Sequence, residues 1–209
     1  MGNGLAATLW AENDDLALAN LNCAFVRGLT TGALPLPDFQ RYVAQDAYFL
    51  EAFARAYALA LVHCRTREEL PTLAELLNGV VKELELHRSY AERWNVYLST
   101  CTPHPAALAY TEFLLATATL SSTGETCAAM TPCMRLYAYL GQTLKQENPN
   151  ATHAYRDWIE TYSDPAFEAL AKQVEGLLDR TADDTPRIRE LYRRAMQLEL
   201  GFFTAFAAG

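Results

Sequence analysis

A proline and a cysteine stand side by side inside a predicted helix, in the stretch MTPCMRLY that begins at Met130. A proline within a helix removes one hydrogen bond and presses on the carbonyl four residues earlier, here Ala128, at a cost of roughly 3 kcal/mol. Apolar residues at helical spacing around Cys133, Tyr137 among them, would suit a packed thiol, because free cysteine is among the most buried residues. The break at Pro132 favours a second interpretation, in which an opened turn lets a ligand approach the sulfur.

Two acidic residues lie among apolar side chains. Asp46 shares one predicted helical face with Tyr42 and Phe49, so it either accepts a hydrogen bond from a neighbouring helix or sits at the edge of that face. Glu199 is flanked at helical spacing by apolar side chains, Phe202 included. Burial would raise the pKa of the Glu199 carboxyl toward the range useful in proton transfer, and a structural ion pair is the alternative.

Two tyrosines could add hydroxyl groups to a pocket. Tyr110 lies in ALAYTEF and Tyr162 in WIETYSD. Each is amphipathic and could equally be an ordinary core or rim residue.

Carboxylate and histidine pairs four residues apart raise the question of a metal site. Glu83 precedes His87, and His153 precedes Asp157. A di-iron centre in a helical bundle needs about four acids and two histidines that converge on the core, and the sequence offers too few. We interpret both pairs as contacts on the helix surface or behind a site, and we expect no metal. The nucleotide, hydrolase and zinc-protease motifs GxGxxG, GxSxG and HExxH are also absent from the sequence.

Length and composition indicate one soluble globular domain over residues 1–209. Hydrophobic residues make up 51% and charged residues 20% of the chain, which is typical of such a domain. No apolar run approaches the roughly 18 residues of a membrane span, and the first residues lack the pattern of a secretory signal, so we expect a cytoplasmic location.

The charge balance and the cysteines exclude further classes. A net charge of −8, from 17 basic and 25 acidic residues, argues against a nucleic-acid partner, because binding phosphates requires a basic surface. Five cysteines at wide, irregular spacing fit neither a disulfide framework nor a zinc knuckle, so we expect reduced thiols.

Helical patterns run through the whole chain, and sustained period-two alternation is missing, which predicts an all-α bundle. Gly28 is expected to end the first helix and Asp38 to cap the second. The predicted helices cover residues 4–27, 38–63, 66 or 71 to 99, 105–122, 125–146, 151–162, 165–180 and 186–208.

The stretch RYVAQDAYFLEAFARAYALAL, residues 41–61, resembles the TenA/THI-4 family, the thiaminase II group, whose second helix carries a YxxQDxxYL-like signature. The similarity continues in order at ELELHRSYAERW, AYTEFL, MTPCMRLY, WIETYS and LELGFF, and so covers nearly the whole chain. This resemblance implies a haem oxygenase-like all-α fold, a homotetramer and no cofactor. It also implies hydrolysis of thiamin, or of 4-amino-5-aminomethyl-2-methylpyrimidine to its hydroxymethyl counterpart and ammonia.

The family's catalytic residues carry over by motif. The nucleophilic cysteine matches Cys133, the pyrimidine-binding aspartate matches Asp46, and the proton-shuttling glutamate matches Glu199. The two pocket tyrosines match Tyr110 and Tyr162.

The resemblance also suggests how the substrate ring is held. Phe49 and Phe202 are expected to flank the flat ring, and Tyr137 joins the expected substrate-binding residues. Many relatives have a tyrosine where Phe49 stands, so one hydroxyl contact is missing from this chain.

Two alternatives to a hydrolase remain open at this point. The same fold hosts metal-dependent oxygenases and a quinone-cofactor enzyme, so a metal- or quinone-dependent oxidoreductase is one. A non-catalytic, pyrimidine-binding regulator is the other, although the acidic charge argues against direct DNA binding.

Overall fold

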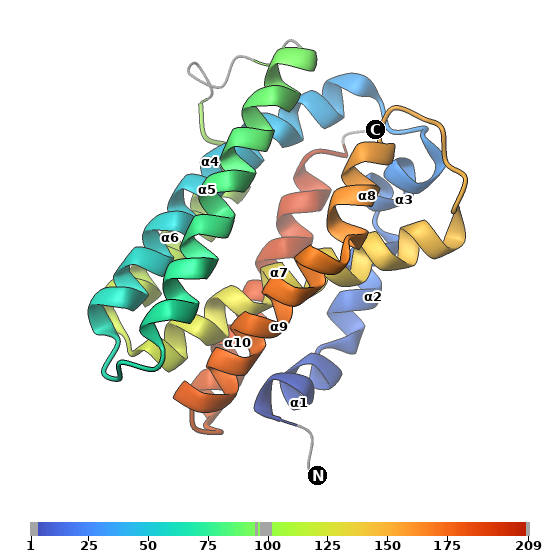
Figure 1. Ribbon diagram of the computed structural model, residues 1–209. Coiled ribbons are helices and arrows are strands. Elements are labelled where there is room, and N and C mark those ends of the chain that lie inside the picture. The colour runs from blue at the N-terminus through green and yellow to red at the C-terminus, as the bar shows by residue number, and fades with distance from the viewer. Residues whose placement is uncertain (1–3, 95, 97–101, 208–209) are drawn as a thin grey trace.

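The computed structural model describes residues 4–94, 96 and 102–207, and Figure 1 shows them as a bundle of helices. Within these ranges the chain forms ten helices and no strand, which confirms the predicted all-α class. The helices are α1 (Leu5–Glu12), α2 (Asp14–Asn22), α3 (Ala24–Thr31), α4 (Leu36–His63), α5 (Leu70–Arg93), α6 (Pro105–Leu120), α7 (Thr123–Glu147), α8 (Arg156–Ser163), α9 (Pro165–Thr181) and α10 (Pro186–Ala205).

The predicted first helix is wrong, because residues 4–27 form parts of three helices. Asn13 ends α1, and its side-chain amide donates to the carbonyl of Leu9 at 2.8 Å, a local bond that competes with helix continuation. Cys23, in an extended conformation, separates α2 from α3. Gly28 does not end the segment, since α3 continues to Thr31 and stops at Gly32. Gly32 has a φ of 74°, which glycine adopts at little cost.

Other predicted boundaries differ by a few residues. Asp38 does not cap α4, because the helix already starts at Leu36 with Pro35 as its N-cap. Asp38 lies in the first turn and forms an ion pair with Arg41. A negative charge at this position stabilises the helix through its interaction with the helix dipole. Helix α8 begins five residues later than predicted, and the predicted ends of two helices, residues 97–99 and 208, lie outside the described residues.

Proline opens three helices at the position where its missing N–H costs nothing. Pro105, Pro165 and Pro186 are the first residues of α6, α9 and α10. In each case the preceding side chain accepts a bond from a backbone N–H of the first turn, and these caps are His104, Asp164 and Thr185. The starts of these three helices are therefore determined by neighbouring residues in the sequence.

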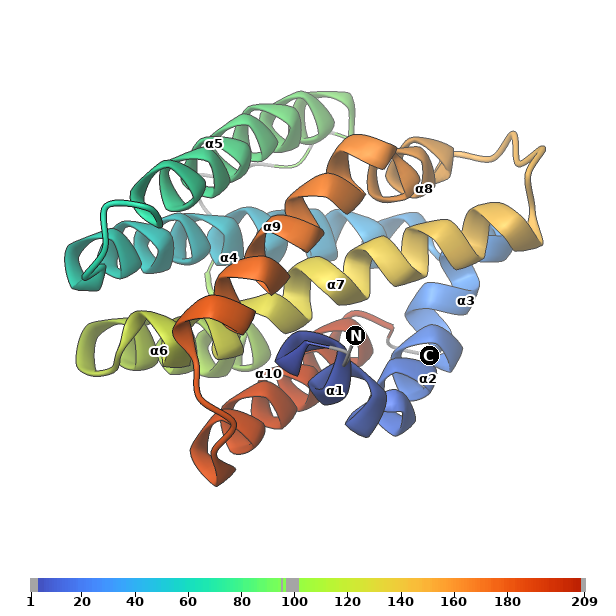
Figure 2. The same cartoon turned by 60° about the horizontal axis from the view of Figure 1, so that its bottom comes forward.

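Helix α7 runs through the middle of the bundle (Figure 2) and packs against α3, α4, α6, α8, α9 and α10. It begins with a capping box between Ser122 and Glu125. All of its residues are described, and the helix is unbroken at Pro132. Helix α7 thus continues through Pro132, and access to Cys133 also depends on the packing of the neighbouring helices.

The remaining long helices surround α7. Helix α4 packs against α5 and α6, and α10 packs against α6 as well as α7. None of the helices in the described ranges has the length and apolar character needed to cross a bilayer. The four cysteines in the described part of the chain are free thiols, namely Cys23, Cys64, Cys127 and Cys133.

Candidate active site

Cys133 of α7 is buried beside three carboxyl groups. Only 8% of the residue is exposed, and the carboxyl of Glu199 on α10 is the acid whose charge acts on the thiol most strongly. Burial is the main cause that raises the pKa of the thiol well above its ordinary value, and the nearby carboxyls of Glu199, Glu83 and Asp46 raise it further. The thiol is therefore protonated near neutral pH, and it needs a base to become a nucleophile.

Glu199 occupies a closed position next to that thiol. The residue is 1% exposed, and the hydroxyl of Tyr110 on α6 donates to its Oε1 at 2.7 Å. Burial raises the pKa of Glu199 to about 8, although the hydrogen bonds from Tyr110 and Cys133 lower it. A carboxyl with this pKa can both give and take a proton near neutral pH.

Asp46 of α4 is held by an imidazole from α5. The Nε2 atom of His87 lies 2.6 Å from Oδ2 of Asp46, and both residues are 3% exposed. The other ring nitrogen, Nδ1, lies 3.1 Å from the backbone carbonyl of Glu83. Burial alone would lower the pKa of His87, but Asp46 and Glu83 outweigh it and raise the pKa to about 9. His87 is therefore an imidazolium near neutral pH.

A chain of hydrogen bonds fixes the carboxylate of Asp46 from a second side. The indole Nε1 of Trp158 donates to the hydroxyl of Tyr42 at 3.1 Å, and that hydroxyl donates to Oδ2 of Asp46 at 3.4 Å. The hydroxyl of Tyr137 lies 3.3 Å from that of Tyr42. Both bonds to Asp46 use Oδ2, so Oδ1 is the oxygen through which this residue can accept a bond from a ligand.

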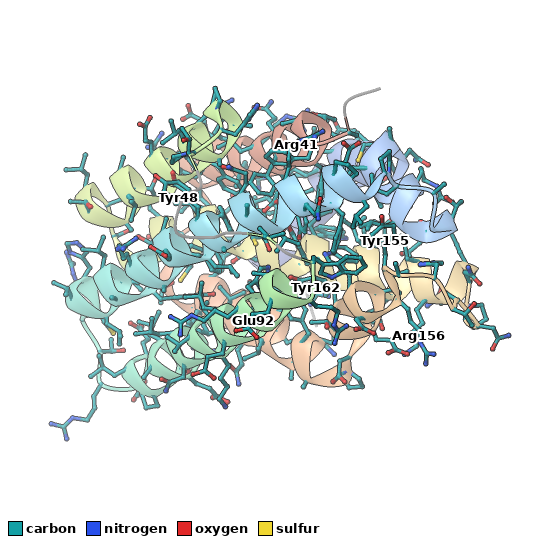
Figure 3. All side chains as sticks on the ribbon, turned by 90° about the horizontal axis from the view of Figure 1, so that it is seen from above. Arg41, Tyr48, Glu92, Tyr155, Arg156 and Tyr162 are labelled. Atoms are coloured by element: carbon teal, nitrogen blue, oxygen red, sulfur yellow. The ribbon has the colours of Figure 1, made fainter. Side chains whose placement is uncertain are left out.

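A third acid of the site, Glu83 of α5, contacts Tyr162 of α8. The hydroxyl of Tyr162 donates to Oε1 of Glu83 at 2.8 Å, and Figure 3 shows Tyr162 between α8 and α5. Burial is the main cause that raises the pKa of Glu83, and Asp46 raises it further.

These groups surround a small cavity of about 260 Å³ of empty space, which includes its opening to solvent. Five of the predicted site residues line it, namely Asp46, Phe49, Cys133, Tyr137 and Tyr162. The other three, Glu199, Tyr110 and Phe202, are not part of its wall. Glu199 and Tyr110 are hydrogen-bonded to each other, and Glu199 acts on the thiol of Cys133.

Phe202 is placed differently from the prediction. Its ring centroid lies 6.0 Å from that of Phe49, and it is not part of the cavity wall. A flat ligand stacked between two rings would separate their centroids by roughly 9 Å or more. In this structure Phe202 therefore packs against Phe49, and of these two rings only Phe49 lies at the cavity wall.

Sequence reasoning underestimated one carboxylate and histidine pair. From the sequence we interpret Glu83 and His87 as contacts on the helix surface or behind a site. In the structure Glu83 lines the cavity, whereas His87 is not part of its wall and contacts Asp46. The four-residue spacing was the available signal, because it puts both side chains on one face of α5. The second pair does not form: Nε2 of His153 lies 3.2 Å from the carbonyl of Thr30, and Asp157 pairs with Arg93.

The described residues contain no group of three or more His, Cys, Asp and Glu side chains arranged to hold a metal ion. The cavity instead combines a thiol, ionisable carboxyls and tyrosine hydroxyls. Such a set is suited to nucleophilic attack on a small polar ring, with proton transfers by the flanking acids.

Comparison with known proteins gives one consistent result. The model of the TENA/THI-4/PQQC family matches residues 11–208. The chain is 31% identical to an aminopyrimidine aminohydrolase of Halalkalibacterium halodurans, over 85% of this chain and 81% of that protein. It is also 35% identical to the bifunctional TH2 protein of Arabidopsis thaliana, over 96% of this chain but only 37% of that longer protein.

Solved structures agree with the sequence matches. A crystal structure of a TenA family transcription regulator from Silicibacter sp. TM1040 superposes with a TM-score of 0.91 at 30% identity. The match covers 99% of this chain and 98% of that one. The predicted family is therefore confirmed, and this chain belongs to the TENA/THI-4/PQQC family.

Proposed function

We propose that this protein is an aminopyrimidine aminohydrolase of thiamin salvage. In this reaction 4-amino-5-aminomethyl-2-methylpyrimidine and water give the hydroxymethyl pyrimidine and ammonia. Family membership supports the class of reaction. The relative from H. halodurans that is named an aminopyrimidine aminohydrolase matches this chain over 81% of its own length. The arrangement that supports the reaction most directly is the Cys133 thiol at the wall of a cavity that Asp46 also lines, with the carboxyl of Glu199 close enough to raise the pKa of the thiol.

The first step is attack by sulfur on the electron-poor pyrimidine ring. Cys133 supplies the sulfur, and its proton must leave because the pKa of the buried thiol is high. Glu199 is the acid that acts on the thiol most strongly and can take its proton, and Tyr110 holds the carboxyl of Glu199 in place.

Asp46 prepares the ring for this attack. Its Oδ1 accepts a hydrogen bond from the ring's amino group and so orients the ring, while Oδ2 stays in contact with His87. As the carbon–sulfur bond forms, negative charge develops on the ring nitrogens. The positive charge of His87, held 2.6 Å from Asp46, offsets part of this charge without reorganisation of water.

Departure of ammonia and entry of water complete the reaction. Glu199 gives a proton to the leaving amine, and its carboxylate then takes a proton from the incoming water. When the hydroxyl group has added, the carbon–sulfur bond breaks and Cys133 recovers its thiol. A pKa of about 8 suits Glu199 to both directions of transfer.

A direct assay tests the proposal. Purified protein is incubated separately with thiamin and with the aminomethyl pyrimidine, and the hydroxymethyl product is quantified. We expect product from the aminomethyl compound, and a loss of several orders of magnitude in turnover in Cys133→Ser. Full activity of this variant would contradict the sulfur chemistry, and no product from either compound would contradict the function.

The homotetramer, the cytoplasmic location and the single domain belong to the same proposal as expectations. Light scattering coupled to size exclusion tests the tetramer. The oxidoreductase alternative predicts stoichiometric iron, manganese or a bound quinone in the purified protein, which elemental and absorbance analysis would detect.

A further inference from the structure

Glu83 lines the cavity but has no part in the reaction steps above. Its carboxyl accepts a hydrogen bond from the hydroxyl of Tyr162 at 2.8 Å, which fixes its orientation. It lies close enough to Cys133 and Asp46 to raise the pKa of the thiol and to have its own pKa raised by Asp46. A carboxyl in this position faces the same space as the substrate.

The charges around the cavity do not balance. Two carboxyl groups, Asp46 and Glu83, belong to its wall, and in the described part of the chain no lysine or arginine does. The cation that acts on Glu83 is the imidazolium of His87, which lies 2.6 Å from Asp46. Within the described part of the chain, an ionised Glu83 is a partly buried negative charge that is stabilised by the hydroxyl of Tyr162 and by an imidazolium shared with Asp46, which is costly without a further cation.

Building on the proposed function, we propose that Glu83 binds the positive charge of the substrate's leaving group and makes the site selective for pyrimidines with a cationic substituent on the C5 methylene. The aminomethyl compound carries such a charge as an ammonium near neutral pH, and thiamin carries it as a thiazolium. The hydroxymethyl product carries none.

Because of this charge difference, the site is expected to bind the substrate more tightly than the product. A charge-assisted hydrogen bond is roughly twice as strong as a neutral one, so the ammonium gains more from Glu83 than the hydroxyl of the product does. The bound ammonium passes one proton to the Glu83 carboxylate, and the amine so formed takes the proton of Glu199 and leaves as ammonia. Glu83 is then left without a cationic partner. The product is therefore bound more weakly than the substrate, which favours its release.

Binding measurements separate this role from catalysis. The Cys133→Ser background prevents turnover, and calorimetry gives the dissociation constants of the aminomethyl and hydroxymethyl pyrimidines. Glu83→Gln in this background keeps an oxygen for Tyr162 and removes the charge. Glu85→Gln is the matched control, because Glu85 is an exposed residue of the same helix.

We expect Glu83→Gln to weaken binding of the aminomethyl compound by roughly 10- to 100-fold, the range for a hydrogen bond to a charged group. Binding of the hydroxymethyl compound is expected to change less than about threefold on the same scale, and Glu85→Gln to change neither. An equal loss for both ligands, or no loss for either, would overturn the role of Glu83.

Two further results keep the test decisive. If Glu83→Gln does not fold, Tyr162→Phe is used instead, because it removes the hydroxyl that orients the Glu83 carboxyl. This variant must shift the ratio of the two dissociation constants in the same direction. An unchanged ratio overturns the proposal. Failure of the proposed function has a different signature, since wild-type protein would then form no product. The binding ratio is measured without turnover.

Discussion

His87 makes an informative target, because its contact with Asp46 can be measured as pH-dependent stability. The pKa of His87 rises from 6.5 to about 9 in the folded protein, mainly because its hydrogen bond and charge interaction with Asp46 outweigh burial. One pKa unit corresponds to about 1.36 kcal/mol, so the pair adds about 3 kcal/mol to the free energy of unfolding when His87 is protonated. A folded pKa above the unfolded value means that this stability is fully present below pH 6.5 and is lost as the pH rises through about 9.

The assay is chemical denaturation at several pH values between 6 and 10. We expect wild-type protein to lose about 3 kcal/mol of stability through this contact across the interval, and His87→Gln to lack that part of the decrease. At pH 6 the variant should be less stable than wild type by a similar amount, because it leaves Asp46 without its cation. Glu199 also contributes to the pH dependence, since its pKa is raised from 4.5 to about 8, but it does so equally in both proteins.

A matched histidine substitution serves as the control. His153 contacts the backbone carbonyl of Thr30, so His153→Gln should leave the slope of stability against pH unchanged. Equal slopes for wild type and His87→Gln between pH 6.5 and 9 would refute the assignment of an imidazolium to this pair.

Three further predictions concern the proton shuttle, the ring contact and the packing of α8. Glu199→Gln should lower kcat by about 10²- to 10⁴-fold and remove the rise in kcat/KM that wild type shows as the pH increases through about 8, because the carboxylate form of Glu199 takes the thiol proton; a variant that keeps this limb would exclude Glu199 as its source. Asp46→Asn should mainly raise the dissociation constant of the hydroxymethyl pyrimidine, measured by calorimetry, whereas unchanged binding would place the ring elsewhere. A Cβ on Gly141 would lie 2.4 Å from the backbone of Tyr162, so Gly141→Ala should displace α8 and cost about 1–3 kcal/mol in thermal or chemical unfolding. Gly201 has open space, so Gly201→Ala should be neutral or stabilising by up to about 1 kcal/mol, and equal effects at both glycines would contradict this packing.

Where the sequence contains local signals for a helix start, such as a proline or a capping residue, the helix was predicted correctly to within a few residues. Proline at the first helical position and a capping side chain before it mark α6, α9 and α10 to within a few residues. The N-terminal segment carries a continuous apolar pattern but no such mark, and the side-chain bond of Asn13 to the carbonyl of Leu9 decides the break between α1 and α2. That bond depends on the conformation of one side chain, which periodicity does not reveal.

The candidate site was predictable only in part, for a similar reason. Spacing along α4, α7 and α10 indicated that Asp46, Cys133 and Glu199 face apolar surroundings, and the structure brings all three to one place. Spacing cannot show the position of Phe202 against Phe49, because that depends on how α10 is rotated against α4. The Asp46–His87 contact joins residues 41 positions apart on different helices, so no local pattern encodes it.

Every buried carboxyl of this site takes its partner from a different helix. Glu199 of α10 relies on Tyr110 of α6, and Asp46 of α4 relies on His87 of α5. Glu83 of α5 relies on a hydroxyl of α8. A carboxyl moved away from its partner by an ångström or two would lose a hydrogen bond without regaining water, and its charged form would become more costly. The packing of the bundle therefore sets the protonation states of the site as well as its shape, and substitutions at helix contacts far from the sulfur should alter the pH dependence of catalysis before they unfold the protein.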